Sequence, residues 1–157
     1  MTHRPSNPEV ARQLEIIRMG AEEILPEAEF VRKLERSIAT GTPLRVKQGF
    51  DPTAPDIHLG HTIGLRKLRQ FQDLGHQVVL IVGSYTALVG DPSGRSETRP
   101  TLNEAEVMAN AQTYLDQFFK VVDKGRTEVR WNGEWFKTMS FVEVLRLASR
   151  FTVARML

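Results

Sequence analysis

The chain has 157 residues, of which 41% are hydrophobic and 25% charged, as in an ordinary globular domain with room for a core. A net charge of +2 is too small to indicate nucleic-acid binding by itself. The sequence has no cysteine, which excludes disulfides and thiolate metal sites. No apolar run approaches the ~20 residues of a membrane span, and no hydrophobic signal segment is present. We therefore expect a cytoplasmic protein without a membrane partner.

An N-terminal helical segment, residues 1–43, is expected to hold two helices. The first is capped at Asn7 and extends to about Ile24. The second begins after Pro26 and ends at Gly41, because glycine readily adopts the left-handed conformation that closes a helix.

Strands and helices alternate in the remaining residues, 44–157. Three segments have strand composition, at residues 44–50, 77–83 and 127–131. Helices are expected from His58 to Leu74 and after the Asn103 cap, with a further helix near the end of the chain. This order implies right-handed crossovers and a parallel sheet. The predicted fold class is α/β, a Rossmann-like parallel sheet with flanking helices, preceded by the N-terminal helices.

The loops after the first two strands contain the unusual residues. "GFDPTAPDIHLGH" (49–61) follows the first strand, and "GSYTALVGDPSGRS" (83–96) follows the second. In open parallel sheets, ligands bind beyond the carboxyl ends of the strands. Both loops should therefore contribute to one site.

His58 and His61 are three residues apart, so they share one face of a first helical turn. The amide dipoles at a helix start favour anions, and imidazoles can donate hydrogen bonds to phosphate oxygens. Gly60 between them leaves space for a nucleotide to approach the backbone. The pair therefore indicates a phosphate-handling site.

The histidine pair has two other interpretations. A metal site needs a third ligand and usually a fourth, which carboxylates such as Asp51, Asp56 or Asp91 would have to supply. We expect no protein-bound metal site. Alternatively, the histidines could only cap a helix or form local hydrogen bonds.

Longer motifs carry a resemblance to a known family. The chain resembles the class I aminoacyl-tRNA synthetases, whose HIGH signature corresponds to "HLGH" (58–61). Within that class it is similar to the bacterial tyrosyl-tRNA synthetases in "FDPTAPDIHLGH", "LRQFQDLGH", "GDPSGRSETR" and "ILPEAEF". The resemblance covers nearly the whole chain and implies that residues 44–157 form the N-terminal part of a Rossmann-like catalytic domain.

The resemblance implies an activity and its partners. Enzymes of this family join tyrosine to ATP, which gives tyrosyl-adenylate and pyrophosphate, and then transfer tyrosine to tRNA(Tyr). The tyrosine carboxylate attacks the α-phosphate, so the protein acts by positioning and by stabilising phosphate charge. ATP is a substrate, and Mg²⁺ is carried by its phosphates. Full-length members are homodimers.

The resemblance also implies roles around ATP. Thr53 and His58 hold the outgoing pyrophosphate, and His61 lies beside the ribose and phosphate. Arg95 and Arg99 match positions that clamp pyrophosphate in the transition state. Gly49 and Gly60 leave room for the nucleotide. Asp51 lies at the reacting centre.

On the tyrosine side, Asp91 is implied to accept from the α-ammonium group, and Thr86 is placed in the amino-acid pocket. Lys47 stands where many family members have a tyrosine that reads the substrate hydroxyl. This departure makes Lys47 the residue expected to decide how that hydroxyl is recognised.

Family members continue for more than this length again. Their continuation carries a second catalytic motif, KMSKS, and the anticodon-binding regions, which are absent here. "FKTMSF" (136–141) has the wrong lysine spacing to replace that motif. We therefore interpret the chain as an N-terminal part, or as a severely shortened relative, that is weakly active or inactive alone. Its residues 141–151 belong to the region where family dimers meet.

Two alternatives stay open. The chain could bind ATP or adenylate without catalysis, as an inactive fragment. Less favoured is a small nucleotidyltransferase of the HxGH type, because "GDPSGRSETR" belongs to the tyrosyl enzymes.

Overall fold

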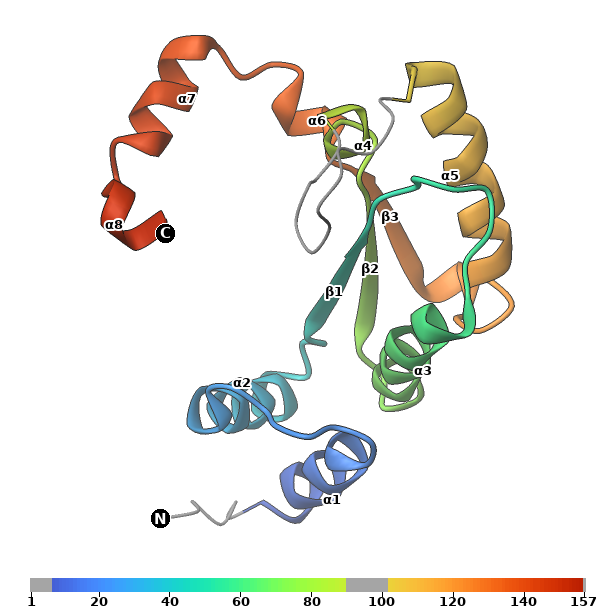
Figure 1. Cartoon of the computed structure of the whole chain (residues 1–157). Helices are drawn as coiled ribbons and strands as arrows, with labels where there is room; N and C mark the ends of the chain where they lie inside the picture. The colour runs from blue at the N-terminus through green and yellow to red at the C-terminus, as the bar shows by residue number, and fades with distance from the viewer. Residues whose placement is uncertain (1–6, 90–101, 157) are drawn as a thin grey trace.

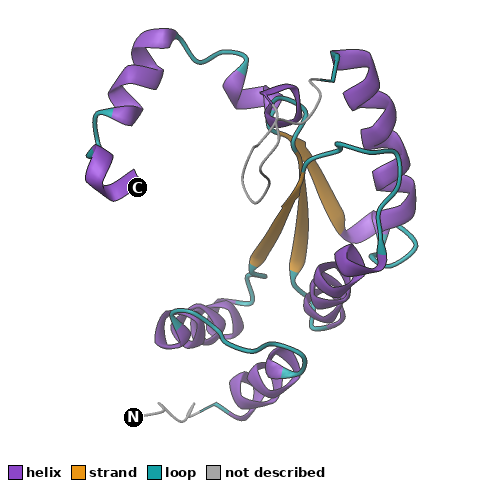
Figure 2. Cartoon of the chain, in the orientation of Figure 1, coloured by secondary structure: helices purple, strands orange, loops and turns teal. Residues whose placement is uncertain are grey.

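A three-stranded parallel sheet forms the centre of the computed structural model, which describes residues 7–89 and 102–156 (Figures 1 and 2). The strands are β1 (Arg45–Phe50), β2 (Gln77–Val82) and β3 (Thr127–Trp131), and they lie in the order β1-β2-β3. In register, Arg45 lies opposite Gln77, and Val78 lies opposite Thr127. The Rossmann-like α/β fold class predicted from the sequence is confirmed.

One face of the sheet carries the main hydrophobic core. Helices α3 (Leu59–Asp73) and α5 (Glu104–Phe118) cover this face (Figure 1). Alternate strand side chains point into it, because successive side chains of a strand point to opposite faces. The fully buried members of the core include Leu65, Val78, Leu80, Ala111 and Phe118. On the opposite face, alternate residues of β1 are exposed.

The N-terminal helices pack beneath the sheet. Helices α1 (Pro8–Arg18) and α2 (Glu27–Thr40) form a second apolar cluster with Phe71 of α3. Gly41 ends α2 in the left-handed conformation, as predicted. The predicted end of α1 at about Ile24 is wrong: the helix ends at Arg18, and Gly20 has a φ of 75°, which does not continue a helix.

Short elements complete the described chain. They are α4 (Thr86–Val89), the 3₁₀ turn η1 (Lys124–Arg126), α6 (Gly133–Phe136), α7 (Phe141–Ala148) and α8 (Val153–Met156). Figure 1 shows α7 and α8 standing away from the sheet, and α7 has no buried residue. Within the described ranges, no helix is both long and apolar enough to cross a membrane.

Candidate functional site

The start of α3 is built by the two histidines of "HLGH". His58 is the N-cap, and its Nδ1 accepts from the Gly60 N–H at 3.1 Å. His61 reaches back, and its Nδ1 accepts from the His58 N–H at 3.2 Å. The ring centroids lie 4.1 Å apart. Local capping by the histidines is therefore present, and it uses one nitrogen of each ring.

These caps decide which nitrogen of each neutral ring carries the proton. Because both Nδ1 atoms accept hydrogen bonds, the neutral rings hold their protons on Nε2. Burial, and next the neighbouring His58, lower the pKa of His61. Near neutral pH, His61 is therefore an uncharged imidazole with an Nε2–H donor, and the cap at Nδ1 likewise leaves Nε2 as the donor of the His58 ring. Two such donors suit phosphate oxygens.

Gly60 is required first by the His58 ring. A Cβ at position 60 would lie 2.8 Å from Cε1 and 2.9 Å from Nδ1 of His58. The glycine thus lets the capping ring fold over the helix start. This reason is structural and differs from the nucleotide clearance predicted from the sequence, which stays a prediction.

A hydrogen-bonded chain joins the carboxyl ends of all three strands. After β1, Asp51 Oδ1 accepts from the Thr86 hydroxyl at 2.7 Å. Thr86 Oγ1 in turn accepts from Asn132 Nδ2, just after β3, at 2.8 Å. Asn132 is buried, and its Oδ1 accepts from the Tyr85 N–H at 2.7 Å. Asp51 and Thr86, assigned separately from the sequence, are thereby in direct contact, which fixes the orientation of the carboxylate.

Gly83 makes room for this carboxylate. A Cβ at position 83 would lie 1.7 Å from Oδ1 of Asp51 and 2.6 Å from Oγ1 of Thr86. No side chain fits there unless the carboxylate moves. Gly83 and Asn132 were not assigned from the sequence, although Gly83 ends one predicted strand and Asn132 follows another, at the rim where ligands are expected.

Two adjoining cavities follow the open face of the sheet. The first, of about 310 Å³, lies at the rim and is lined by Gly49, Phe50, Asp51, Ile81, Gly83, Thr86 and Asn132. The second, of about 390 Å³, is lined by Arg45, Lys47, Val79, Ile81, Arg130 and Trp135. Ile81 borders both. Lys47 and Gly49 lie on the same exposed side of β1, and each lines one of the two cavities.

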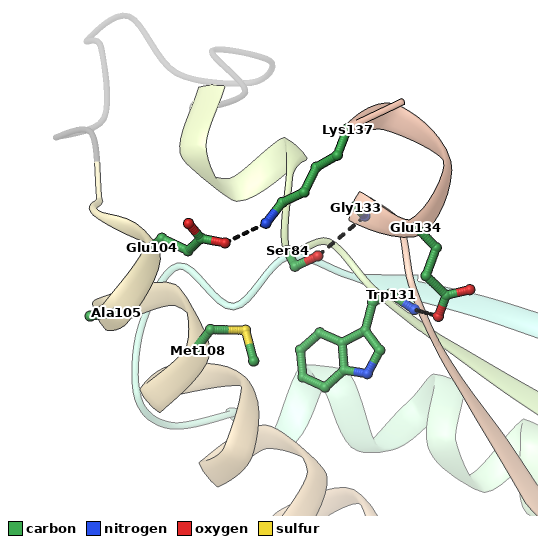
Figure 3. Close-up of a pocket in the computed structure, with 8 residues that line it drawn as sticks. All are labelled: Ser84, Glu104, Ala105, Met108, Trp131, Gly133, Glu134 and Lys137. Carbon is green, nitrogen blue, oxygen red and sulfur yellow. Dashed lines mark hydrogen bonds and ion pairs between the residues drawn. The ribbon is translucent and has the colours of Figure 1, made fainter. Parts of the chain in front are cut away.

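A larger cavity of about 780 Å³ opens at the same end of the sheet, between α5, α6 and the end of β3. Figure 3 shows Trp131 and Met108 facing each other across it, with an ion pair between Lys137 and Glu104 near its opening. That ion pair lowers the pKa of Glu104. None of the sequence-assigned residues that the structure describes lines this cavity.

The other sequence-predicted residues fall into two groups. Thr53 lies half-buried in the loop between β1 and α3, and its N–H donates to the Asp51 carbonyl at 2.8 Å. Asp91, Arg95 and Arg99 lie outside the described residues. Among those described, no group of three or more histidine and acidic side chains could hold a metal ion.

Comparisons with known proteins agree with this architecture. Residues 39–157 match the family model described as tRNA synthetases class I (W and Y). A tyrosine–tRNA ligase of Moorella thermoacetica is 60% identical over 149 residues, covering 95% of this chain and 36% of the relative. A tyrosine–tRNA ligase of Bordetella pertussis is 54% identical over 153 residues, covering 98% of this chain and 37% of the relative. The chain thus spans little more than a third of these relatives.

The fold is also found in solved structures. The tyrosyl-tRNA synthetase of Archaeoglobus fulgidus, crystallised with L-tyrosine, superposes with a TM-score of 0.74 at 22% identity, over 92% of this chain and 42% of that one. The resemblance read from the motifs is confirmed by the family model and the sequence relatives. This chain belongs to the class I tRNA synthetases of the tryptophan and tyrosine family.

Proposed function

We propose that this chain supplies the HIGH-motif half of a site that activates tyrosine with ATP, within the N-terminal part of a catalytic domain at residues 44–157. The tyrosine carboxylate attacks the α-phosphate, tyrosyl-adenylate forms, and pyrophosphate leaves. The full-length enzyme then transfers tyrosine to tRNA(Tyr). The observation that carries the proposal is that the capped His58–His61 pair lies beside the carboxyl end of β1: the His61 ring is 6.1 Å from the ring of Phe50, the residue before Asp51.

Residues at the start of α3 bind and stabilise the phosphates of ATP. The Nε2–H groups of His58 and His61 stabilise charge that grows on the phosphates as the pentacovalent phosphorus forms. Thr53 holds the pyrophosphate together with His58, and Arg95 and Arg99 clamp it from the following loop. Mg²⁺ enters on the phosphates of ATP, and no protein-bound metal is part of the proposal.

The open face of the sheet binds the amino acid. The rim cavity holds the reacting carboxylate near Asp51, with Thr86 beside it and Asp91 accepting from the ammonium group. The exposed strand face at Gly49 offers a floor without a side chain for an aromatic ring. The ring then points along β1 towards Lys47, whose ammonium group donates to the phenolic oxygen.

Tyrosine-dependent ATP–pyrophosphate exchange tests the proposal. In the full-length enzyme, we expect exchange that requires tyrosine and falls about a hundredfold in His58→Ala, as when one donor to a developing oxyanion is lost. Arg69→Ala, at the far end of the same helix, should leave exchange unchanged. Exchange that ignores His58→Ala would refute the assigned chemistry. Binding of ATP without exchange would favour the alternative of a nucleotide-binding half-site.

Substitution of Lys47 tests which amino acid the site selects as substrate. In Lys47→Met, the KM for tyrosine should rise while phenylalanine, which lacks the hydroxyl, is activated no worse than before. Activation of tryptophan in place of tyrosine would keep the family and overturn the tyrosine assignment.

The partners beyond the small molecules are part of the same proposal. Dimerisation through the region of residues 141–151 follows from the family resemblance, as does a cytoplasmic location. The apolar side chains of α7 agree with such an interface: Phe141 is 73% exposed and Leu145 is 52% exposed.

A further inference from the structure

Helix α5 has a polar stripe beside its buried face. Asn110, Thr113 and Gln117 are spaced three and four residues apart, so they lie in one line along the helix. The neighbouring line includes Ala111, Tyr114 and Phe118, which are buried in the main core. The core therefore holds this stripe in a fixed position.

The stripe contacts the loop that carries the candidate catalytic residues. Asn110 Nδ2 donates to the Pro52 carbonyl at 3.2 Å. Gln117 uses both ends of its amide: Nε2 donates to Asp56 Oδ1 at 3.1 Å and to the Pro55 carbonyl at 3.3 Å, while Oε1 accepts from the Ile57 N–H at 3.1 Å. The Thr113 hydroxyl also lies against the Pro55 carbonyl. These bonds reach both ends of the loop.

The loop has little backbone bonding of its own. Pro52 and Pro55 have no N–H to donate. Among the described residues, the backbone bonds formed inside the loop before α3 consist of the one from the Thr53 N–H to the Asp51 carbonyl. Side chains of α5 therefore supply most of the bonds that determine the path of the loop.

The anchored atoms adjoin the candidate catalytic residues. Pro52 directly precedes Thr53, and Ile57 directly precedes His58, the cap of α3. Resting on the function proposed above, we propose that Gln117, together with Asn110, is a positioning residue for pyrophosphate release. The two amides fix where Thr53 and His58 stand relative to the rim, because a small misplacement of such groups costs much of the rate.

The test compares Gln117→Leu with Gln112→Leu. Leucine is close in shape to glutamine and cannot form the hydrogen bonds. Gln112 lies on the same helix and bonds only to Asp116 of that helix among the described residues, so it is a matched control. The first readout needs no activity: amide hydrogen exchange of Ile57 should speed up at least about tenfold in Gln117→Leu and stay unchanged in Gln112→Leu.

The second readout is ATP–pyrophosphate exchange in a chain that performs it. In Gln117→Leu, kcat should fall about tenfold with little change in the KM for tyrosine, since the amino-acid cavity is lined by other elements. In the His58→Ala background, the same substitution should cost much less, because the group that it positions is gone.

The outcomes separate this inference from the function on which it rests. An unchanged Ile57 exchange rate in Gln117→Leu would overturn the positioning role, whatever the activity. Equal losses of kcat with and without His58 would also overturn it. Faster Ile57 exchange in a full-length enzyme that shows no pyrophosphate exchange would support the anchoring of the loop and refute the proposed function instead.

Discussion

Helix α3, at the rim of the sheet, and helix α7 begin with the same kind of cap but differ in what packs against them. Both α3 and α7 begin with a capping box, from His58 and His61 in one case and from Ser140 and Glu143 in the other. Helix α3 buries Leu65 and further side chains, whereas α7 buries none. Local sequence can thus start a helix, but burial supplies most of the stability.

The largest expected effect compares one leucine from each region. Leu65 is fully buried beneath the HIGH motif, and Leu145 of α7 is 52% exposed. Leu65→Ala should lower the free energy of unfolding by about 2–5 kcal/mol, because it leaves a cavity. Leu145→Ala should change it by less than about 0.5 kcal/mol. Urea denaturation measures both, and equal losses would show that α7 packs as tightly as α3.

A second comparison concerns two glycines. Gly83→Ala places a methyl group where the Asp51 carboxylate lies, whereas a Cβ at Gly125 would be no closer than 3.4 Å to the nearest atom, in Asp123. We expect Gly83→Ala to slow pyrophosphate exchange about a hundredfold, because it displaces the carboxylate that is proposed to lie at the reacting centre. Gly125→Ala should leave the rate unchanged. An active Gly83→Ala enzyme would show that the orientation of Asp51 is unimportant.

Sequence patterns predicted the features that depend on neighbours in the chain. The cap at Asn103, the end of α2 at Gly41 and the three parallel strands are found where periodicity and turn residues indicated them. The end of α1 was misjudged because apolar residues continue beyond it to Ile24, while Gly20 turns the chain.

The parts that were missed depend on contacts between distant residues. Asn132 lies 46 residues from its partner Thr86, and Gln117 lies 60 residues from Ile57. The local sequence does not show which groups these amides contact. Their partners appear only when the strands are paired and α5 is packed on them. The histidine pair was found because its atoms meet within one helical turn.

Helix α7 gives a third, smaller effect. If its apolar face is part of a dimer interface, Leu145→Glu should weaken self-association about tenfold or more, because a carboxylate would be buried. Leu25→Glu is the matched control, since Leu25 is 82% exposed and lies between α1 and α2. Analytical ultracentrifugation over a range of concentrations compares the two. An unchanged dissociation constant in Leu145→Glu would remove α7 from the interface.

The smallest expected effect is a pH dependence at the base of the sheet. Burial lowers the pKa of His76, whose Nδ1 accepts from the Leu44 N–H at 3.2 Å and whose Nε2 therefore donates to Gln13 at 3.0 Å. The unfolded chain takes up this proton near pH 6.5, about the ordinary pKa of histidine, before the folded chain does. The contribution of His76 to the free energy of unfolding should therefore be fully present above that pH. It should decrease as the pH falls from about 7 to 5.

His76→Asn tests this assignment, because the asparagine Oδ1 can replace Nδ1 as the acceptor for Leu44 and does not titrate. Urea denaturation at several pH values should show a smaller slope in the variant. Some slope should persist, because burial also lowers the pKa of His61 at the other end of the sheet. An identical slope in both proteins would show that His76 does not link the stability of this region to pH. If the variant showed no slope at all, the pKa of His61 would be the same in the folded and the unfolded chain.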